Sequence, residues 1–149
     1  MILTVHLLAG AVIAQNFPYL IPGLFSAFLS HYFLDFLFHR EYLIKNILEK
    51  RWRNSFFDFL KVVLDLLFGI FLVLVFSKNI LLAFVGGFFG ILPDGMTFLF
   101  LLFPRNKFLK KHYYFHRRVI HFFANKKIPL FWGIFNQVLL FSIAVYFLR

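Results

Sequence analysis

The chain has 149 residues, of which 62% are hydrophobic and 23% aromatic, and its formal net charge is +10. Soluble domains contain roughly 45–50% apolar residues, so this composition predicts an all-α integral membrane protein with one transmembrane domain over residues 1–149. The absence of cysteine excludes disulfides and thiolate metal ligands. We attribute the positive charge to basic membrane loops and expect no nucleic-acid partner.

Five apolar segments follow one another along the chain, and a helix needs about 20 apolar residues to cross a bilayer. All but the first approach this length. The first can tilt, stop partway or pack inside the bundle, and we interpret it as a retained helix because it lacks a basic start and a clear cleavage site. The predicted spanning helices are Ile2–Ala14, Tyr19–Phe38, Phe56–Phe76, Ile80–Phe103 and Ile128–Leu148.

Two polar connections, His39–Ser55 and Pro104–Lys127, hold most of the 16 Lys and Arg residues. If five helices span, both connections lie on one side, and the positive-inside rule places that side in the cytoplasm. The protein would then be integral to the cytoplasmic (inner) membrane. Its N-terminus would face the cytoplasm and its C-terminus the outer side. Residues Lys107–Ala124 mix basic and aromatic side chains, which predicts an amphipathic surface helix in contact with membrane lipids.

The stretch Ser30–Tyr42 reads SHYFLDFLFHREY and carries His31, Asp35 and His39 at intervals of four residues. Such side chains share one helix face, because two intervals turn by only about 80°. Neighbours rise by about 6 Å, which one ion can bridge, whereas His31 and His39 lie about 12 Å apart. Either one ion binds His31 and Asp35, or the stripe holds two ions. The alternative is a His31–Asp35 hydrogen bond with His39 at the membrane interface.

Two further motifs carry polar residues at the same predicted membrane face. In LPDG, Pro93 removes a backbone donor and Gly95 permits unusual backbone angles, so we expect either a helix break that exposes Asp94 or a simple helix end. In HRRVIH, His116 and His121 are separated by about 140° on a regular helix, so one ion would join them only across an irregularity. The alternative is a basic surface helix whose histidines contact lipid headgroups.

Two residue pairs predict packing contacts. Asp58 and Asp65 share a helix face with Lys61 between them, which favours a salt bridge. Gly86 and Gly90 form a G-x-x-x-G spacing, which predicts close contact with another helix.

Four short motifs resemble those of the LexA-binding, inner-membrane-associated family of metal-dependent hydrolases. They are TVH ending at His6, SHYFLD at Ser30–Asp35, LPD ending at Asp94, and HRRVIH at His116–His121. The chain departs from the family in the order of its motifs and in the residues after LPD, where the family has a further Asp and His. The resemblance implies metal binding by His6, His31, Asp35, Asp94, His116 and His121.

We therefore predict a membrane-embedded, metal-dependent hydrolase with a His/Asp site at the cytoplasmic face. A Zn, Mn or Fe ion would acidify a bound water and polarise the scissile group. The expected catalytic residues are Asp94 and His121. We expect His39, Asp65 and His112 to orient the ligands or relay protons. A phosphoester or phospholipid headgroup would be held by Lys110, Lys111, Arg117 and Arg118.

Two other functions use the same residues, and the oligomeric state is left open. A metal or proton transporter would need polar residues reaching the outer half of the membrane, and the sequence has almost none there. A non-catalytic membrane adaptor would recruit a partner through its basic loops. An adaptor does not explain why Asp35 and Asp94 lie within apolar segments.

Overall fold

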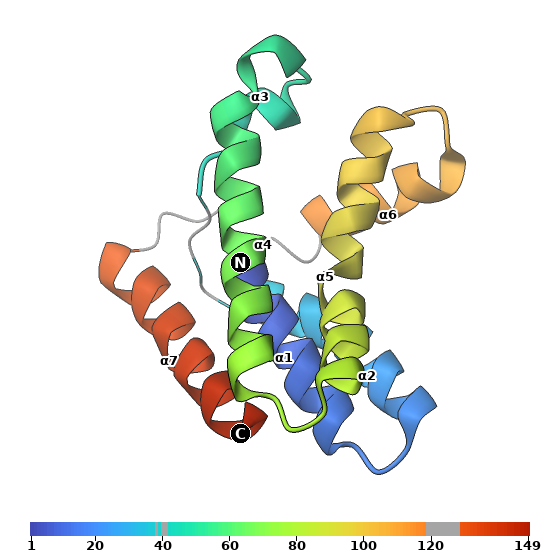
Figure 1. Ribbon diagram of the computed structural model, residues 1–149. Helices are drawn as coiled ribbons and strands as arrows, with labels where there is room; N and C mark the ends of the chain where they lie inside the picture. Colours follow the sequence, from blue (N-terminus) through green and yellow to red (C-terminus); the bar gives the residue numbers. More distant parts are fainter. Residues whose placement is uncertain (38, 40–41, 119–128) are drawn as a thin grey trace.

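The computed structural model describes residues 1–37, 39, 42–118 and 129–149 (Figure 1). Within these ranges the chain is helical and has no strand, which confirms the predicted all-α class. His121 and the end of the predicted surface helix, residues 119–124, lie outside the described residues. The helices are α1 (Leu3–Asn16), α2 (Leu20–Phe36), α3 (Lys45–Leu48), α4 (Phe56–Phe76), α5 (Ile80–Leu102), α6 (Lys107–Arg118) and α7 (Leu130–Leu148), with a 3-10 turn η1 (Trp52–Asn54) before α4.

Three helices are long and apolar enough to cross a membrane, namely α4, α5 and residues Phe131–Leu148 of α7. Their outer faces expose large apolar side chains, including Phe57 (70%), Leu81 (76%) and Tyr146 (74%). Apolar faces of this kind are typical of helices surrounded by lipid. Helices α1 and α2 are apolar but have only 14 and 17 residues, or about 21 and 26 Å against a hydrocarbon core of about 30 Å. Passage of all five through the membrane therefore stays a prediction.

Helix α1 is the centre of the bundle and packs against α2, α4, α5 and α7. Val5, Leu8 and Ala11 on this helix are completely buried. Of the three arrangements that the short first segment allowed, the structure has the one in which it packs inside the bundle. A helix enclosed by protein on several sides does not need the length of a membrane span.

The backbones of α1 and α5 touch directly through glycine. A Cβ atom added at Gly86 would lie 2.5 Å from the carbonyl oxygen of Gly10, and one added at Gly90 would overlap the carbonyl oxygen of His6. Both distances are too short for a methyl group, so only glycine allows this approach. The close contact predicted from the G-x-x-x-G spacing is confirmed, and it brings His6 against α5.

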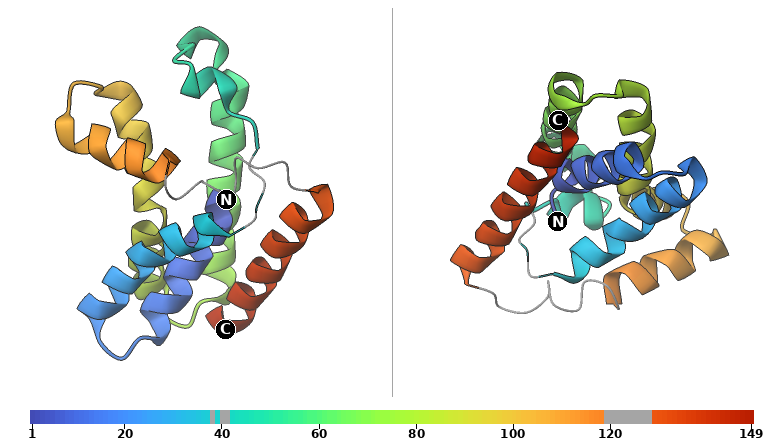
Figure 2. Two further views of the ribbon diagram at one scale, coloured as in Figure 1. Left: turned by 180° about the vertical axis from the view of Figure 1, so that it is seen from behind. Right: turned by 90° about the horizontal axis from the view of Figure 1, so that it is seen from below.

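Helices α3 and α6, which carry parts of the two basic connections, lie at one end of the α4–α5 pair (Figures 1 and 2). The turn between α4 and α5 and the C-terminus lie toward the opposite end. Helix α5 continues through Pro93, so it neither breaks nor ends at LPDG as the sequence suggested. A proline removes only one hydrogen bond of the helix, and neighbouring helices can compensate for this loss. Asp94 therefore projects from the middle of a continuous helix.

Candidate metal centre

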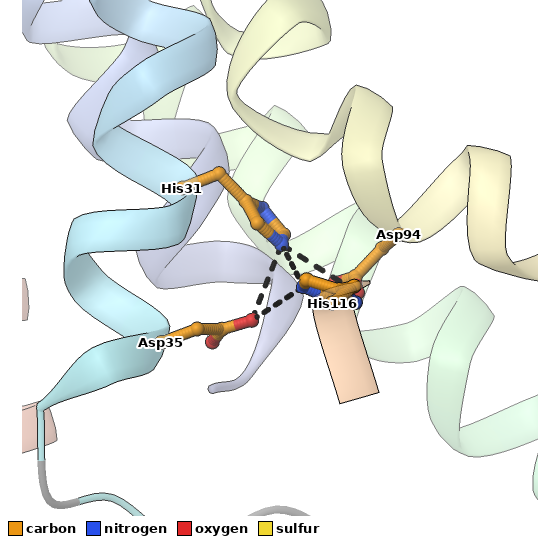
Figure 3. A group of neighbouring side chains, drawn as sticks. All are labelled: His31, Asp35, Asp94 and His116. Carbon is orange, nitrogen blue, oxygen red and sulfur yellow. Dashed lines mark hydrogen bonds and ion pairs between the residues drawn. The ribbon is translucent and has the colours of Figure 1, made fainter. Parts of the chain in front are cut away.

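Four potential metal ligands from three helices point toward one another (Figure 3). His31 and Asp35 come from α2, Asp94 from α5 and His116 from α6. One ligand atom of each residue lies within 4.8 Å of those of the other three. The first two and His116 are buried, whereas Asp94 is partly exposed. This group, which we call the metal cluster, could hold one metal ion.

The distances within the metal cluster fit a single ion. His31 Nε2 lies 3.2 Å from Asp35 Oδ2 and 3.0 Å from His116 Nε2. His116 Nε2 is 3.0 Å from the same carboxylate oxygen, and Asp94 Oδ1 is 3.7 Å from His31 Nε2. Four ligands at about 2.0–2.2 Å from a tetrahedral ion are about 3.3–3.6 Å from one another. Small adjustments of these side chains would therefore bring three or all four of them to coordination distance from one ion.

The outer nitrogens of both histidines have partners that orient the rings. His31 Nδ1–H donates to the carbonyl oxygen of Gly90 at 2.8 Å. In a neutral ring this leaves the lone pair on Nε2, the atom that faces the metal cluster. His116 Nδ1 lies 3.3 Å from the hydroxyl of Thr97. Metal-binding histidines are usually held by such contacts at the second ring nitrogen, so the donor set fits a divalent ion.

The second oxygen of Asp35 faces a different group of side chains. Asp35 Oδ1 lies 3.0 Å from His6 Nε2 and 3.8 Å from His39 Nε2, and it accepts a 2.7 Å hydrogen bond from the amino group of Met1. The His6 ring also stacks on His31, with ring centroids 4.0 Å apart. His6 and His39 thus meet the metal cluster through Asp35, and neither belongs to the group of four.

His112 precedes His116 by one turn on α6, and the rings of the two residues stack with centroids 5.6 Å apart. Its Nε2 shares a 3.0 Å hydrogen bond with the hydroxyl of Tyr32. Burial lowers the pKa of His112 to about 4, and the neighbouring His116 contributes to the same lowering. His112 is therefore neutral at pH 7, and its position beside a ligand is compatible with the expected orienting role.

Asp65, a residue of α4, contacts the first residues of α1. Its carboxylate accepts hydrogen bonds from the Leu3 N–H (2.6 Å) and the Thr4 N–H (3.2 Å), and a further one from the Tyr42 hydroxyl (3.1 Å). The first N–H groups of a helix have no partner within the helix, and here Asp65 supplies one. Asp65 thus anchors α1, the helix that carries His6. Among the described residues, its hydrogen bonds go to the start of α1 and to Tyr42 and not to His31 or His116. The sequence had suggested an orienting or proton-relay role.

The predicted salt bridge of α4 forms between Lys61 and Asp58, with Nζ 3.4 Å from the carboxylate. Asp58 also accepts a 2.8 Å hydrogen bond from the backbone N–H of Asn46. These contacts tie α3 to α4, which explains a carboxylate at the start of an apolar helix without a catalytic role.

Of the four predicted phosphate-binding residues, only Arg117 lines the cavity beside the metal cluster within the described chain. Lys110, Lys111 and Arg118 are exposed on α6. The guanidinium of Arg118 lies over the ring of Tyr114, 5.0 Å from its centroid. Of these four basic side chains of α6, one thus lies at the cavity and the other three lie on the surface.

Sequence reasoning did not identify Tyr32 and Thr97. Tyr32 follows His31 directly, and Thr97 comes three residues after Asp94, a spacing that places two side chains on one helix face. For Thr97, a polar residue one turn from a candidate ligand in an apolar helix, this spacing was a usable signal, whereas the position of Tyr32 directly after His31 was not.

No protein-family model, curated protein or solved structure matches this chain. The family resemblance based on four short motifs therefore stays a prediction.

Proposed function

We propose that the protein is a membrane-embedded, metal-dependent hydrolase whose site is the metal cluster. One observation carries this proposal: Asp94 and His116 also line a cavity of about 420 Å³. Structural metal sites are closed by protein ligands, whereas catalytic sites keep a position open for water or substrate. The cavity supplies this open side.

The nitrogen and oxygen ligands suit a divalent Zn, Mn or Fe ion. Such an ion, when bound, lowers the pKa of a coordinated water and polarises the scissile group. His31 and His116 are held for this task by the carbonyl of Gly90 and the hydroxyl of Thr97. Asp35 supplies a negative charge that offsets part of the charge of the ion.

In this proposal His31, Asp35 and His116 hold the ion, and Asp94, on the open side, is the general base. Its side chain is 31% exposed, lines the cavity and lies 3.7 Å from His31, so it can reach a water that attacks the substrate. With a phosphoester, the water oxygen bonds to phosphorus and one P–O bond breaks. The proton removed by Asp94 passes to the departing oxygen. Arg117, on the same cavity wall, pairs with the phosphate oxygens.

We further infer that the site opens toward the cytoplasmic side of an inner membrane, with the N-terminus inside and five helices in the bilayer. This inference is based on the Lys and Arg residues of the two connections that contain α3 and α6, helices that lie at one end of the bundle. The exposed apolar side chains then contact membrane lipids, and phosphoesters or phospholipid headgroups of the inner leaflet reach the site.

The test uses purified protein stripped with a chelator and reloaded with Zn, Mn or Fe. Metal content and the hydrolysis of bis-p-nitrophenyl phosphate are measured for Asp94→Asn and for Glu49→Gln. The latter is a matched control, because Glu49 is an accessible carboxylate on the surface that pairs with Arg51 at 2.9 Å. We expect about one ion per chain in the wild type and a loss of turnover of roughly 10²–10⁴-fold for Asp94→Asn alone.

Equal turnover in the two variants would remove Asp94 from the mechanism. Metal binding without hydrolysis of any phosphoester, with all three metals tried, would contradict the hydrolase and favour the transporter.

A further inference from the structure

The cavity beside the metal cluster is mainly apolar. Its volume of about 420 Å³ lies in the range of small-molecule binding sites, which is about 300–1,000 Å³. Its walls come largely from α3, α4 and α5 and include Ile47, Phe59, Val62, Phe88 and Phe98. The last two are ten residues apart on α5, so the cavity extends about 15 Å along this helix. Apolar cavity walls of this kind favour the binding of apolar molecules.

Polar side chains line one part of the same cavity. They are Asp94 and His116 of the metal cluster, together with Thr97 and Arg117. Beside Asp94 the space is open, because a Cβ atom added at Gly95 would meet no atom within 4 Å. A molecule in the cavity can therefore touch the metal cluster with one end and apolar walls with the rest. Arg117 adds a positive charge for an anionic end.

We propose that the cavity holds the hydrocarbon chain of the substrate, so that the protein hydrolyses phosphoesters that carry an apolar chain. This inference rests on the proposed function and adds the substrate class. The chain lies against Val62 and Phe98, and the phosphate pairs with Arg117 beside Asp94. Water adds to phosphorus, one P–O bond breaks, and the departing oxygen receives the proton that Asp94 removed from the water.

The apolar walls predict a measurable dependence on chain length. Burial of one methylene contributes about 0.8 kcal/mol, which is a factor of about four. A hexyl ester has four more methylenes than an ethyl ester, so its kcat/KM should be higher by on the order of 10²-fold.

The experiment compares ethyl and hexyl p-nitrophenyl phosphate on the metal-loaded protein in detergent. Two neighbouring residues of α4 provide matched variants, because Val62 lines the cavity whereas Val63 is 46% exposed on the outer face. Val62→Phe should lose most of the hexyl preference, measured as the ratio of kcat/KM for the hexyl and ethyl esters. Val63→Phe should behave as the wild type, and it controls for partition of the hexyl ester into detergent.

Each result decides between the two proposals. Equal kcat/KM for ethyl and hexyl esters in an active wild type would overturn the chain-binding inference and leave the hydrolase intact. The same conclusion follows if Val62→Phe and Val63→Phe keep equal hexyl preferences. If Val62→Phe does not fold, Leu48→Phe narrows the cavity from α3.

If no ester is hydrolysed, the proposed hydrolase function is refuted. The chain-binding inference is then tested by comparing the affinities of the protein for ethylphosphonate and hexylphosphonate. A hexyl preference of on the order of 10²-fold that Val62→Phe removes would support a chain site. Equal binding of the two phosphonates would refute it.

Discussion

Replacement of Gly90 by alanine tests whether the direct contact of α1 with α5 keeps the metal cluster in place. A Cβ atom at Gly90 would overlap the carbonyl oxygen of His6 and lie 3.2 Å from Gly10 Cα, whereas ordinary contacts begin at 3.4 Å. Both opposing atoms belong to the backbone, so they cannot rotate away and α1 must move. The carbonyl oxygen of Gly90 also accepts a hydrogen bond from His31. A shift of this contact would therefore move both His6 and His31, the two histidines that contact Asp35.

Overpacking in a close helix contact costs about 1–3 kcal/mol, and a helical Gly-to-Ala change returns about 0.5–1 kcal/mol. The free energy of unfolding should therefore fall by about 1–2 kcal/mol. For a chain of this size each kcal/mol corresponds to about 2–4 °C in Tm, so we expect a fall of roughly 2–8 °C. Metal affinity should fall too, because His6 and His31 no longer meet Asp35 at their present distances.

The assay is thermal unfolding in detergent, followed by circular dichroism, together with metal content. Gly95→Ala is the matched control, because it makes the same change on the same helix and its Cβ meets no atom within 4 Å. Its Tm should stay the same or rise by up to about 4 °C. A Tm for Gly90→Ala equal to that of Gly95→Ala, with full metal content, would refute the role of this contact.

Removal of His31 by His31→Ala should lower metal content to below about a tenth of the wild-type value, measured by mass spectrometry, and retention of the metal would exclude His31 as a ligand. Thr97→Val should weaken metal affinity by about tenfold in a chelator competition, because His116 loses the contact at its second nitrogen, while Thr97→Ser keeps the wild-type affinity. Equal affinities of the two would show that the hydroxyl does not orient His116. Chelation of the bound ion should lower Tm by roughly 5–10 °C if free metal stood at about 100 times its Kd, and an unchanged Tm would argue against binding to the folded state. For the orientation, Lys78→Cys should react with an impermeant reagent in intact cells and Lys45→Cys should not, and the reverse pattern would invert the topology.

Local spacing in the sequence was sufficient to find the two candidate ligands of α2. His31 and Asp35 are four residues apart, so any α-helix places them on one face, and their side chains are 3.2 Å apart in the structure. The contact between Lys61 and Asp58 is local in the same sense. The apolar segments likewise predicted the all-α class and five spanning helices, of which three are long and apolar enough to cross a membrane. Each of these features depends on residues within one helix, whose geometry is regular.

The assembly of the metal cluster was decided by the tertiary structure. His116 is 81 residues from Asp35 along the chain, and no periodicity within either helix predicts that the two meet. The same is true of Asp65, which caps α1 from α4, and of the apolar cavity next to Asp94. Contacts of this kind depend on how closely whole helices pack. Here that closeness comes from glycines that let α1 lie against α5, and it is this packing that turns scattered histidines and carboxylates into one site.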